Sequence, residues 1–352
     1  MTEISHPTIS DVAREAEVSI GTVSKALGGS GRMRDDTRAR VVEVAKRLGY
    51  TSRSPRRQTR ASRSYTIGLL TTDSFTRFAI PMMLGVEDAL SAGQISVLLA
   101  DGRGDPIREN HHLQTFLARR VDAIIVTGRR AEARAPIGIP TRVPVCYVLS
   151  PSQRSEDLSI VIDDEQGARL AISHLLSLGR RRIAYVSGPQ KHLSARLRHT
   201  GMVKRLREAG IEQSEDVVMW GEWSEAWGRQ AASILARSST PVDAVFCGSD
   251  QIARGVVEQL QQESIRVPED VSVVGFDNWD VMAMASRPML TTIDPRLDDL
   301  GRLAAESVLS ILDGNELRGA IAHECELVVR ESTAVLNAGS PGVARADSEE
   351  RR

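Results

Sequence analysis

The sequence predicts a small all-α unit at the N-terminus, followed by an α/β domain of two similar halves, each built on a doubly wound parallel sheet. Apolar residues repeat at helical spacing in three short segments between residues 8 and 50. From residue 66 onward, short β-rich runs alternate with longer helical patterns. The segments VDAIIVTG (121–128) and VDAVFCGS (242–249) resemble each other closely, which indicates two halves with a ligand cleft at the carboxyl ends of their strands.

The N-terminal unit is predicted to contain three amphipathic helices. Thr8 and Asp11 form a capping-box pattern before the first helix, Ser19 is placed to cap the second, and Gly49 stands where the third would end. The apolar stripes are Ile9, Val12, Ala13 and Ala16, then Ile20, Val23 and Leu27, then Val41, Val44, Ala45 and Leu48. Such stripes fit either a helix-turn-helix, whose second helix enters the major groove of DNA, or another small three-helix bundle.

Positive charge is concentrated in this N-terminal part. Residues 1–66 hold 13 Arg and Lys against 7 Asp and Glu, a net charge of +6, whereas the whole chain carries −1. Residues 52–65 have no apolar periodicity and are rich in arginine, so we expect a basic hinge linker that is disordered without DNA. A charge run is often only a solvated segment, but one that follows a helix-turn-helix can meet phosphates.

The sequence lacks the motifs that are typical of several other classes of protein. The three cysteines are widely spaced, which favours packed thiols in a reducing cytosol over a metal site or a disulfide framework. The N-terminus has no signal-peptide pattern and no 18-residue apolar run occurs, so we expect a soluble, cytoplasmic protein and not an extracytoplasmic sugar-binding protein. Neither a phosphate-binding loop nor a hydrolase or metalloprotease motif is present, and the seven histidines are scattered. We therefore expect no enzyme activity and no cofactor.

The segments TISDVAREAEVSIGTVSKAL and TRARVVEVAKRLGY resemble the DNA-binding head of the LacI/GalR family of repressors. Further landmarks, among them DDEQGARLAISHLLSLGRRRIAYVSGP, RVPEDVSVVGFDN, LTTIDP and LVVREST, extend the resemblance to about residue 335. It implies a helix-turn-helix head (1–51), the hinge (52–65) and a two-lobed periplasmic-binding-protein-like domain. The N-terminal lobe would comprise 66–162 plus 292–324, the C-terminal lobe 163–291 plus 325–337, and residues 338–352 a disordered tail.

The resemblance further implies a homodimer that represses transcription from a near-palindromic operator under the control of a small, sugar-like effector. A corepressor-dependent regulator and a small-molecule-binding protein without a regulatory role are the alternatives. By position, Ile20, Gly21 and Lys25 would face base edges. The hydroxyl residues suited to phosphates, or only to capping and solvated surface, are Thr8, Ser19, Thr22 and Ser24.

The hinge departs from the family pattern. Thr59 stands at the position where the family wedges a leucine into the minor groove, and Pro55 would break or shift the hinge helix. The arginines that could still follow the groove are Arg53, Arg56, Arg57 and Arg60.

Effector-binding residues are carried over in the same way. Arg196, in SARLRHTG, is placed at the position of the arginine that holds effector with a forked hydrogen bond, and Trp223 at an aromatic stacking position. The other candidates are Asp73, Phe75, Phe78, Asp250 and Asp277. Structural roles are the alternatives. Phe75 or Phe78 could belong to the core, Trp227 could pack in the interior, and Asp277 could cap the following helix.

Overall fold

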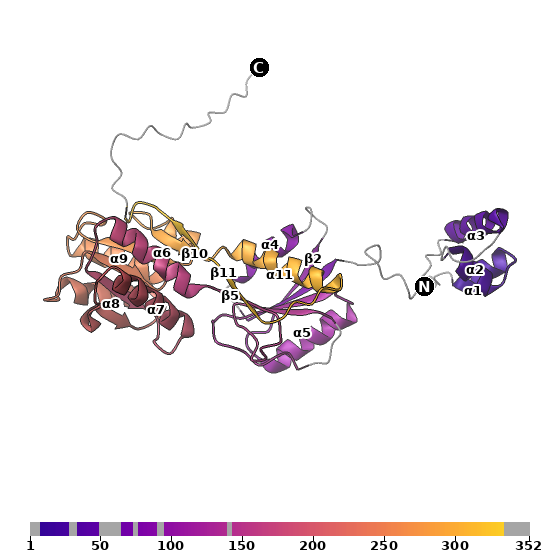
Figure 1. The fold of residues 1–352 in the computed structure, drawn as a ribbon, viewed down its shortest axis with the longest axis horizontal. Coiled ribbons are helices and arrows are strands. Elements are labelled where there is room, and N and C mark those ends of the chain that lie inside the picture. The colour runs from indigo at the N-terminus through magenta and orange to yellow at the C-terminus, as the bar shows by residue number, and fades with distance from the viewer. Residues whose placement is uncertain are drawn as a thin grey trace, which may run out of the picture. The chain divides into compact units, whose positions relative to one another are not determined.

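The computed structural model describes residues 8–27, 34–48, 65–72, 77–89, 95–138 and 143–333 (Figure 1). The chain divides into two compact units, residues 1–63 and 64–352. Some predicted features lie outside the described residues: the tail, the hinge residues Arg53, Pro55, Arg56, Arg57, Thr59 and Arg60, and the effector candidates Asp73 and Phe75.

The N-terminal unit contains α1 (Ile9–Glu15), α2 (Ile20–Leu27) and α3 (Asp35–Leu48). The predicted capping box is confirmed: the Thr8 N–H and hydroxyl donate to the Asp11 carboxylate at 2.9 and 2.6 Å, and the Asp11 N–H donates back to Thr8 Oγ1 at 3.4 Å. Ser19 Oγ accepts from the Thr22 N–H at 3.1 Å, as a cap of α2 should. The buried core comprises Val12, Ala13, Ala16, Val23, Ala26, Val41, Val44 and Ala45.

Ile20 is the exception to the predicted stripes. It is 51% exposed, because α2 turns Val23 and Ala26 toward the other helices and leaves the first residue of the helix outside. Ile20 therefore lies outside the buried part of the apolar stripe, and its side chain stands on the outer surface of α2.

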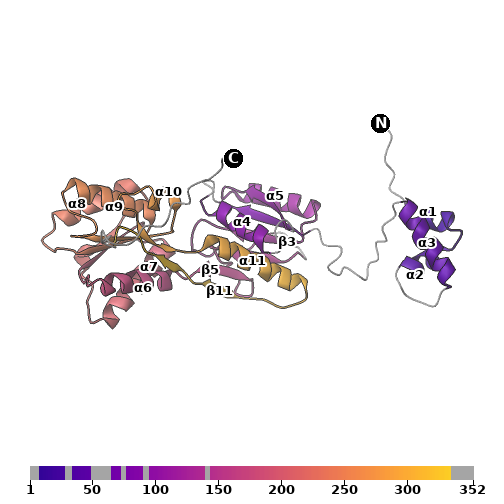
Figure 2. The same cartoon turned by 90° about the horizontal axis from the view of Figure 1, so that it is seen from above.

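The larger unit contains two six-stranded sheets (Figures 1 and 2). In the first, all strands are parallel, in the order β11-β5-β4-β3-β1-β2. Helices α4 and α11 pack on one face and α5 on the other. The strands are β1 (Thr66–Thr71), β2 (Ser96–Asp101), β3 (Ala123–Thr127), β4 (Val145–Val148), β5 (Ser159–Ile162) and β11 (Ala320–His323); the helices are α4 (Ala79–Asp88), α5 (Pro106–Ala118) and α11 (Leu297–Leu312).

The second sheet has the order β12-β10-β9-β8-β6-β7, with only β12 antiparallel. Helices α6 and α7 cover one face, and α8 and α9 the other. The elements are α6 (Asp164–Ser177), β6 (Ile183–Ser187), α7 (Leu193–Glu208), a 3₁₀ turn (Glu215–Val217), β7 (Val218–Trp220), α8 (Glu225–Ala236), β8 (Ala244–Cys247), α9 (Asp250–Gln262), β9 (Ser272–Phe276), α10 (Asp280–Ala283), β10 (Thr291–Asp294) and β12 (Glu326–Val328). The predicted fold class, two doubly wound sheets in one α/β domain, is confirmed.

The two similar sequence segments occupy equivalent places. They form β3 and β8, the third strand from one edge of each sheet. The aspartate that precedes each strand also has the same role. Asp122 accepts from the Thr66 N–H at 3.1 Å, and Asp243 accepts from the N–H groups of Arg181 and Arg182 at 3.0 and 2.9 Å. Each carboxylate thus ties the start of β1 or β6 to its neighbouring strand.

The chain passes between the sheets three times, after β5, after β10 and after β11. The second passage follows Asp294, whereas the predicted boundary lies between residues 291 and 292. The boundary needs this correction because all of β10 pairs with β9 and β12 of the second sheet. We use "N-terminal lobe" and "C-terminal lobe" for the parts built on the first and second sheets.

Candidate functional site

Helix α2 presents an exposed face on the N-terminal unit. Gly21 and Lys25 are exposed one helical turn apart, next to the exposed Ile20. The hydroxyls of Ser19 and Thr22 are 2.9 Å apart, and both lie at the start of this helix. Ser24 lies on α2 as well. This face combines one cation, one apolar side chain and a glycine that permits close approach, as a groove-reading helix requires.

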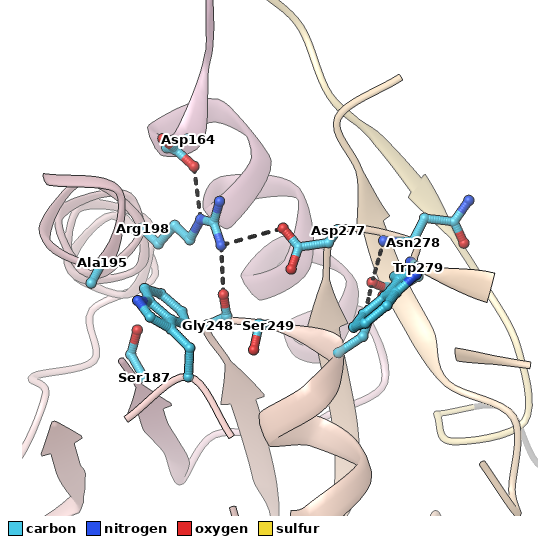
Figure 3. A network of polar contacts seen from close by, with 12 residues as sticks. Asp164, Ser187, Ala195, Arg198, Gly248, Ser249, Asp277, Asn278 and Trp279 are labelled. Carbon is cyan, nitrogen blue, oxygen red and sulfur yellow. Dashed lines mark hydrogen bonds and ion pairs between the residues drawn. The ribbon is translucent and has the colours of Figure 1, made fainter. Parts of the chain in front are cut away.

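A buried arginine lies at the centre of a polar network at the carboxyl ends of the strands in the C-terminal lobe (Figure 3). Arg198 on α7 is 6% exposed, and its Nε donates to Asp164 Oδ1 at 2.7 Å. Its Nη1 donates to the Gly248 carbonyl at 2.5 Å and lies 3.8 Å from Asp277 Oδ1. The guanidinium also stacks on Phe276, 3.5 Å from the ring centroid. Burial of this cation is possible because two carboxylates and a carbonyl surround it.

Asp250, the first residue of α9, is fully buried beside this network. Its carboxyl group accepts from Thr292 Oγ1 at 2.5 Å and from the Trp279 N–H at 2.7 Å. Burial, followed by the charge of Asp277, raises the pKa of Asp250 to about 8. At neutral pH the group is therefore largely protonated, which limits the negative charge at this edge.

Asp277 connects the two lobes. Its Oδ2 pairs with Arg77, which precedes α4 in the N-terminal lobe. The Arg77 guanidinium also lies 4.8 Å from the Trp279 ring centroid and 4.9 Å from that of the half-buried Phe78. Asp277 has φ 108°, a strained conformation for a non-glycine residue. Asp277 does not cap α10, because the N-cap residue of that helix is Trp279. Its carboxylate instead interacts with Arg77 and Arg198.

A second contact crosses the lobe boundary. Glu132, which follows β3, accepts from the Leu193 N–H through Oε1 at 2.7 Å. Leu193 begins α7, and the N-cap residue His192 provides no side-chain cap. The Glu132 carboxylate thus occupies the positive end of a 16-residue helix in the other lobe. Its Oε2 is buried without a hydrogen-bond partner among the described residues.

The two predicted tryptophans have different surroundings. The ring of Trp223 lies parallel to that of His192 at 6.2 Å, and its Nε1–H donates to His192 Nδ1 at 2.8 Å. It also covers Gly188, where a Cβ would lie 2.2 Å from the indole. Trp227 donates to the Ser187 carbonyl at 2.9 Å and packs on the core, as its packing interpretation predicts.

Arg196 does not join the Arg198 network. Its side chain is exposed, and Nη1 donates to the carbonyls of Gln190 and Lys191 at 3.2 and 2.7 Å. Residues two apart on a helix point about 200° apart, so only one of these two arginines can face the strand ends. Of the two, Arg198 faces the strand ends, so Arg198 takes the place of Arg196 in the proposal for effector binding below.

Helical phase could have identified Arg198 from the sequence. It lies three residues from Ala195 and four from Met202, both fully buried, whereas Arg196 lies off that stripe. The other network residues absent from the predicted set are Arg77, Glu132, Asp164 and Trp279. Within the described ranges, no three metal-binding side chains cluster, and no helix is long and apolar enough to span a membrane.

Comparisons with known proteins agree with this organisation. Residues 8–52 match the model described as bacterial regulatory proteins, lacI family, and residues 172–333 match a periplasmic binding protein-like domain. The ribose operon repressor of Haemophilus influenzae is 31% identical over 92% of this chain and 98% of its own length. Catabolite control protein A of Priestia megaterium is 29% identical over 93% of this chain and 99% of its own.

Solved structures give the same result over both units. A complex of the transcriptional regulator CelR with cellobiose is 30% identical, covers 93% of this chain and 99% of its own, and has a TM-score of 0.63. The lac repressor dimer bound to operator and an anti-inducer is 26% identical, with 94% and 100% coverage and a TM-score of 0.66. These relatives are regulators of transcription and not enzymes, and the chain belongs to the lacI family of bacterial DNA-binding transcription regulators.

Proposed function

We propose that this protein is a cytoplasmic repressor that binds a near-palindromic operator as a homodimer and is controlled by a sugar-like effector in the cleft between its lobes. The exposed face of α2 carries the proposal. On this face Ile20 is 51% exposed beside the exposed Lys25. An apolar contact to a thymine methyl and a cationic contact to guanine O6 and N7 explain both residues.

The chemistry of the cleft edge supports a hydroxylated effector. Arg198 offers guanidinium donors, Asp277 carboxylate acceptors and Trp223 an aromatic face. Such a combination suits sugar hydroxyls on one side of a ring and its C–H groups on the other. The names of two relatives, a ribose operon repressor and a regulator in complex with cellobiose, point to the same ligand class.

The cross-lobe contacts provide a route from effector to DNA. An effector that binds Asp277 competes with Arg77 for the same carboxylate and so alters the balance between lobe arrangements. Coupling between two such sites is typically about 1–3 kcal/mol. That is sufficient to change operator affinity between about fivefold and 150-fold.

Exposed apolar residues support the homodimer. Ile80 and Leu84 lie one turn apart on α4 at 37% and 50% exposure, and Val281 and Met284 around α10 are 61% and 45% exposed. Large side chains gathered on two helices are typical of a surface that another chain covers. One of the solved relatives is described as a dimer on its operator.

A gel-shift titration on the DNA upstream of the protein's own gene, with and without a panel of sugars at fixed salt, tests the proposal. Lys25→Ala should weaken operator binding by about 1–3 kcal/mol, and Lys46→Ala, an exposed lysine on α3, is the matched control. Release of the operator by a sugar supports an inducer, and tightening supports the corepressor-dependent alternative. Unchanged operator affinity in Lys25→Ala would contradict the assigned recognition face.

A further inference from the structure

The segment 277–279, which follows β9, lies between two places where the lobes meet. Its first and last residues contact Arg77 of the N-terminal lobe, the first as an ion pair and the last through its indole ring. The side chain of Asn278 points the other way, away from the Arg198 network (Figure 3). It reaches Asp294, the last residue of β10, where the chain leaves the C-terminal lobe. The segment therefore contacts the lobe boundary on both of its sides.

The Asn278 amide uses both of its ends. Its Nδ2 donates to Asp294 Oδ2 at 2.8 Å, and its Oδ1 accepts from Arg330 Nη2 at 2.8 Å. Only this orientation places the amide donor against the carboxylate and the amide acceptor against the guanidinium. Asn278 also has φ 45°, in the left-handed region that asparagine tolerates. Both its backbone and its side chain are thus suited to asparagine.

Asp294 connects this amide to the start of the other lobe. Its second oxygen, Oδ1, accepts from the Arg296 N–H at 2.7 Å. Arg296 is the N-cap residue of α11 and has φ 52°, which a residue other than glycine adopts only when its surroundings hold it there. One carboxylate therefore joins the side chain of Asn278 to the first backbone group of the passage that enters the N-terminal lobe.

The Arg296 side chain connects elements of both lobes. Its Nε and Nη2 lie 2.9 and 2.8 Å from Asp299 Oδ2 on α11, in the N-terminal lobe. Its Nη1 lies 3.1 Å from Glu326 Oε1 on β12, in the C-terminal lobe. Arg302 holds the other oxygen of Asp299 at 2.7 Å. The second passage between the lobes is thereby tied to the end of the third.

The third passage is tied to the first in turn. The Asp163 N–H donates to the His323 carbonyl at 2.9 Å. The side-chain amide of Gln166 pairs with both backbone groups of Cys325: its Oε1 accepts from the N–H at 2.9 Å, and its Nε2 donates to the carbonyl at 3.3 Å. A change at Asn278 can consequently reach all three passages through direct contacts.

We propose that Asn278, Asp294 and Arg296 form a relay that couples the segment 277–279 to the passages between the lobes. An effector that binds Asp277 displaces this segment, and the relay transmits the displacement to α11. The three residues are positioning residues and not effector ligands. The relay supplies a contiguous set of contacts whose balance both sites can bias. Its use by an effector rests on the proposed function, whereas the relay itself does not.

Hydrogen–deuterium exchange of the full chain, without DNA and followed by mass spectrometry, tests the relay. Asn278→Asp keeps an acceptor for Arg330 and tolerates the left-handed backbone, but it places a carboxylate against that of Asp294. We expect the amides of residues 296–300, in the other lobe, to exchange about threefold faster or more. Asn315→Asp, an exposed residue beyond the far end of α11, is the matched control and should change exchange at 296–300 by less than about 1.5-fold.

A rescue variant separates the relay from a local structural role. Asn278→Asp/Asp294→Asn exchanges the amide and the carboxylate. The amide at position 294 can then donate to position 278 and accept from the Arg296 N–H, so exchange at 296–300 should return to within about 1.5-fold of wild type. The relay is overturned if Asn278→Asp changes exchange only within the C-terminal lobe, or if the double variant exchanges as fast as Asn278→Asp.

Gel shifts with the same variants distinguish failure of the relay from failure of the proposed function. If a sugar of the panel changes the operator affinity of wild type, the ratio of affinities with and without that sugar should be smaller in Asn278→Asp and should recover in the double variant. Faster exchange in Asn278→Asp without operator binding by wild type overturns only the repressor. A sugar-dependent operator affinity with unchanged exchange at 296–300 in Asn278→Asp overturns only the relay.

Discussion

The two lobes share one strand order but differ in the side chains at the carboxyl ends of their strands. In the C-terminal lobe the strand ends lead into a buried network, in which Arg198, Asp164 and Asp277 satisfy one another. In the N-terminal lobe the equivalent ends surround an open cavity lined by four arginines. The first arrangement pairs its charges within one buried network, whereas the second distributes its charged side chains around open space. Equivalent topology therefore does not imply equivalent chemistry.

Removal of Arg198 should have the largest effect, because it disrupts the paired network that distinguishes the C-terminal lobe. Arg198→Ala leaves Asp164 buried without its cation and Asp277 with Arg77 alone, so we expect a loss of about 3–5 kcal/mol in the free energy of unfolding. All four tryptophans lie in the C-terminal lobe, so urea unfolding followed by tryptophan fluorescence reports this lobe. Arg196→Ala, on the same helix but exposed, is the control and should cost less than about 0.5 kcal/mol. If both variants lost the same free energy of unfolding, the assignment of the buried network to Arg198 and not to Arg196 would be contradicted.

The buried carboxyl group of Asp250 should give the C-terminal lobe a pH dependence of its own. Its native pKa of about 8 lies above the ordinary value of 3.8, so the native state keeps a proton that the unfolded chain has lost. This stabilisation is complete below about pH 4 and falls by about 1.4 kcal/mol for each pH unit as the pH rises toward 8. Asp250→Asn keeps a neutral group there and should remove that slope. If the free energies of unfolding of the variant and of wild type changed equally between pH 5 and 8, Asp250 would be ionised in the native state.

Substitutions of Arg77 test the contacts that this residue makes across the lobe boundary with Asp277 and Trp279. Arg77→Ala should lower the free energy of unfolding by about 2 kcal/mol or less, because Asp277 still has Arg198 nearby. Loss of the guanidinium from the Trp279 ring should also change the emission of that indole. Arg77→Lys, which keeps the charge but lacks the planar group, is the matched comparison. Identical emission in wild type and both variants would mean that Arg77 does not contact Trp279 in solution.

The smallest expected effect concerns Glu132. Glu132→Gln retains an acceptor for the Leu193 N–H but removes the negative charge at the start of α7. We expect a loss of about 0.3–1 kcal/mol in thermal or urea unfolding, and a smaller loss at high salt. Glu156→Gln, an exposed carboxylate of the same lobe, serves as the control. A loss that does not respond to salt would assign Glu132 a packing role instead.

Local signals in the sequence were sufficient for most elements. The Thr8–Asp11 capping box and the alternation of strands with helices depend on neighbouring residues, and both are present in the structure. The choice between Arg196 and Arg198 required the rotational phase of α7, which a motif alone does not contain. Arg77 and Trp279 are about 200 residues apart and meet only because the lobes face each other. No periodicity or spacing in the sequence records such a contact.

The three passages between the lobes also determine the order in which the protein can be completed during synthesis. The helices of the N-terminal unit end at Leu48, so this unit can fold as soon as its first 50 or so residues have left the ribosome. Neither large sheet is complete until β11 and β12, residues 320–328, have been made. The nascent chain therefore carries a finished helix-turn-helix unit for most of its synthesis, long before either sheet of the larger unit is complete.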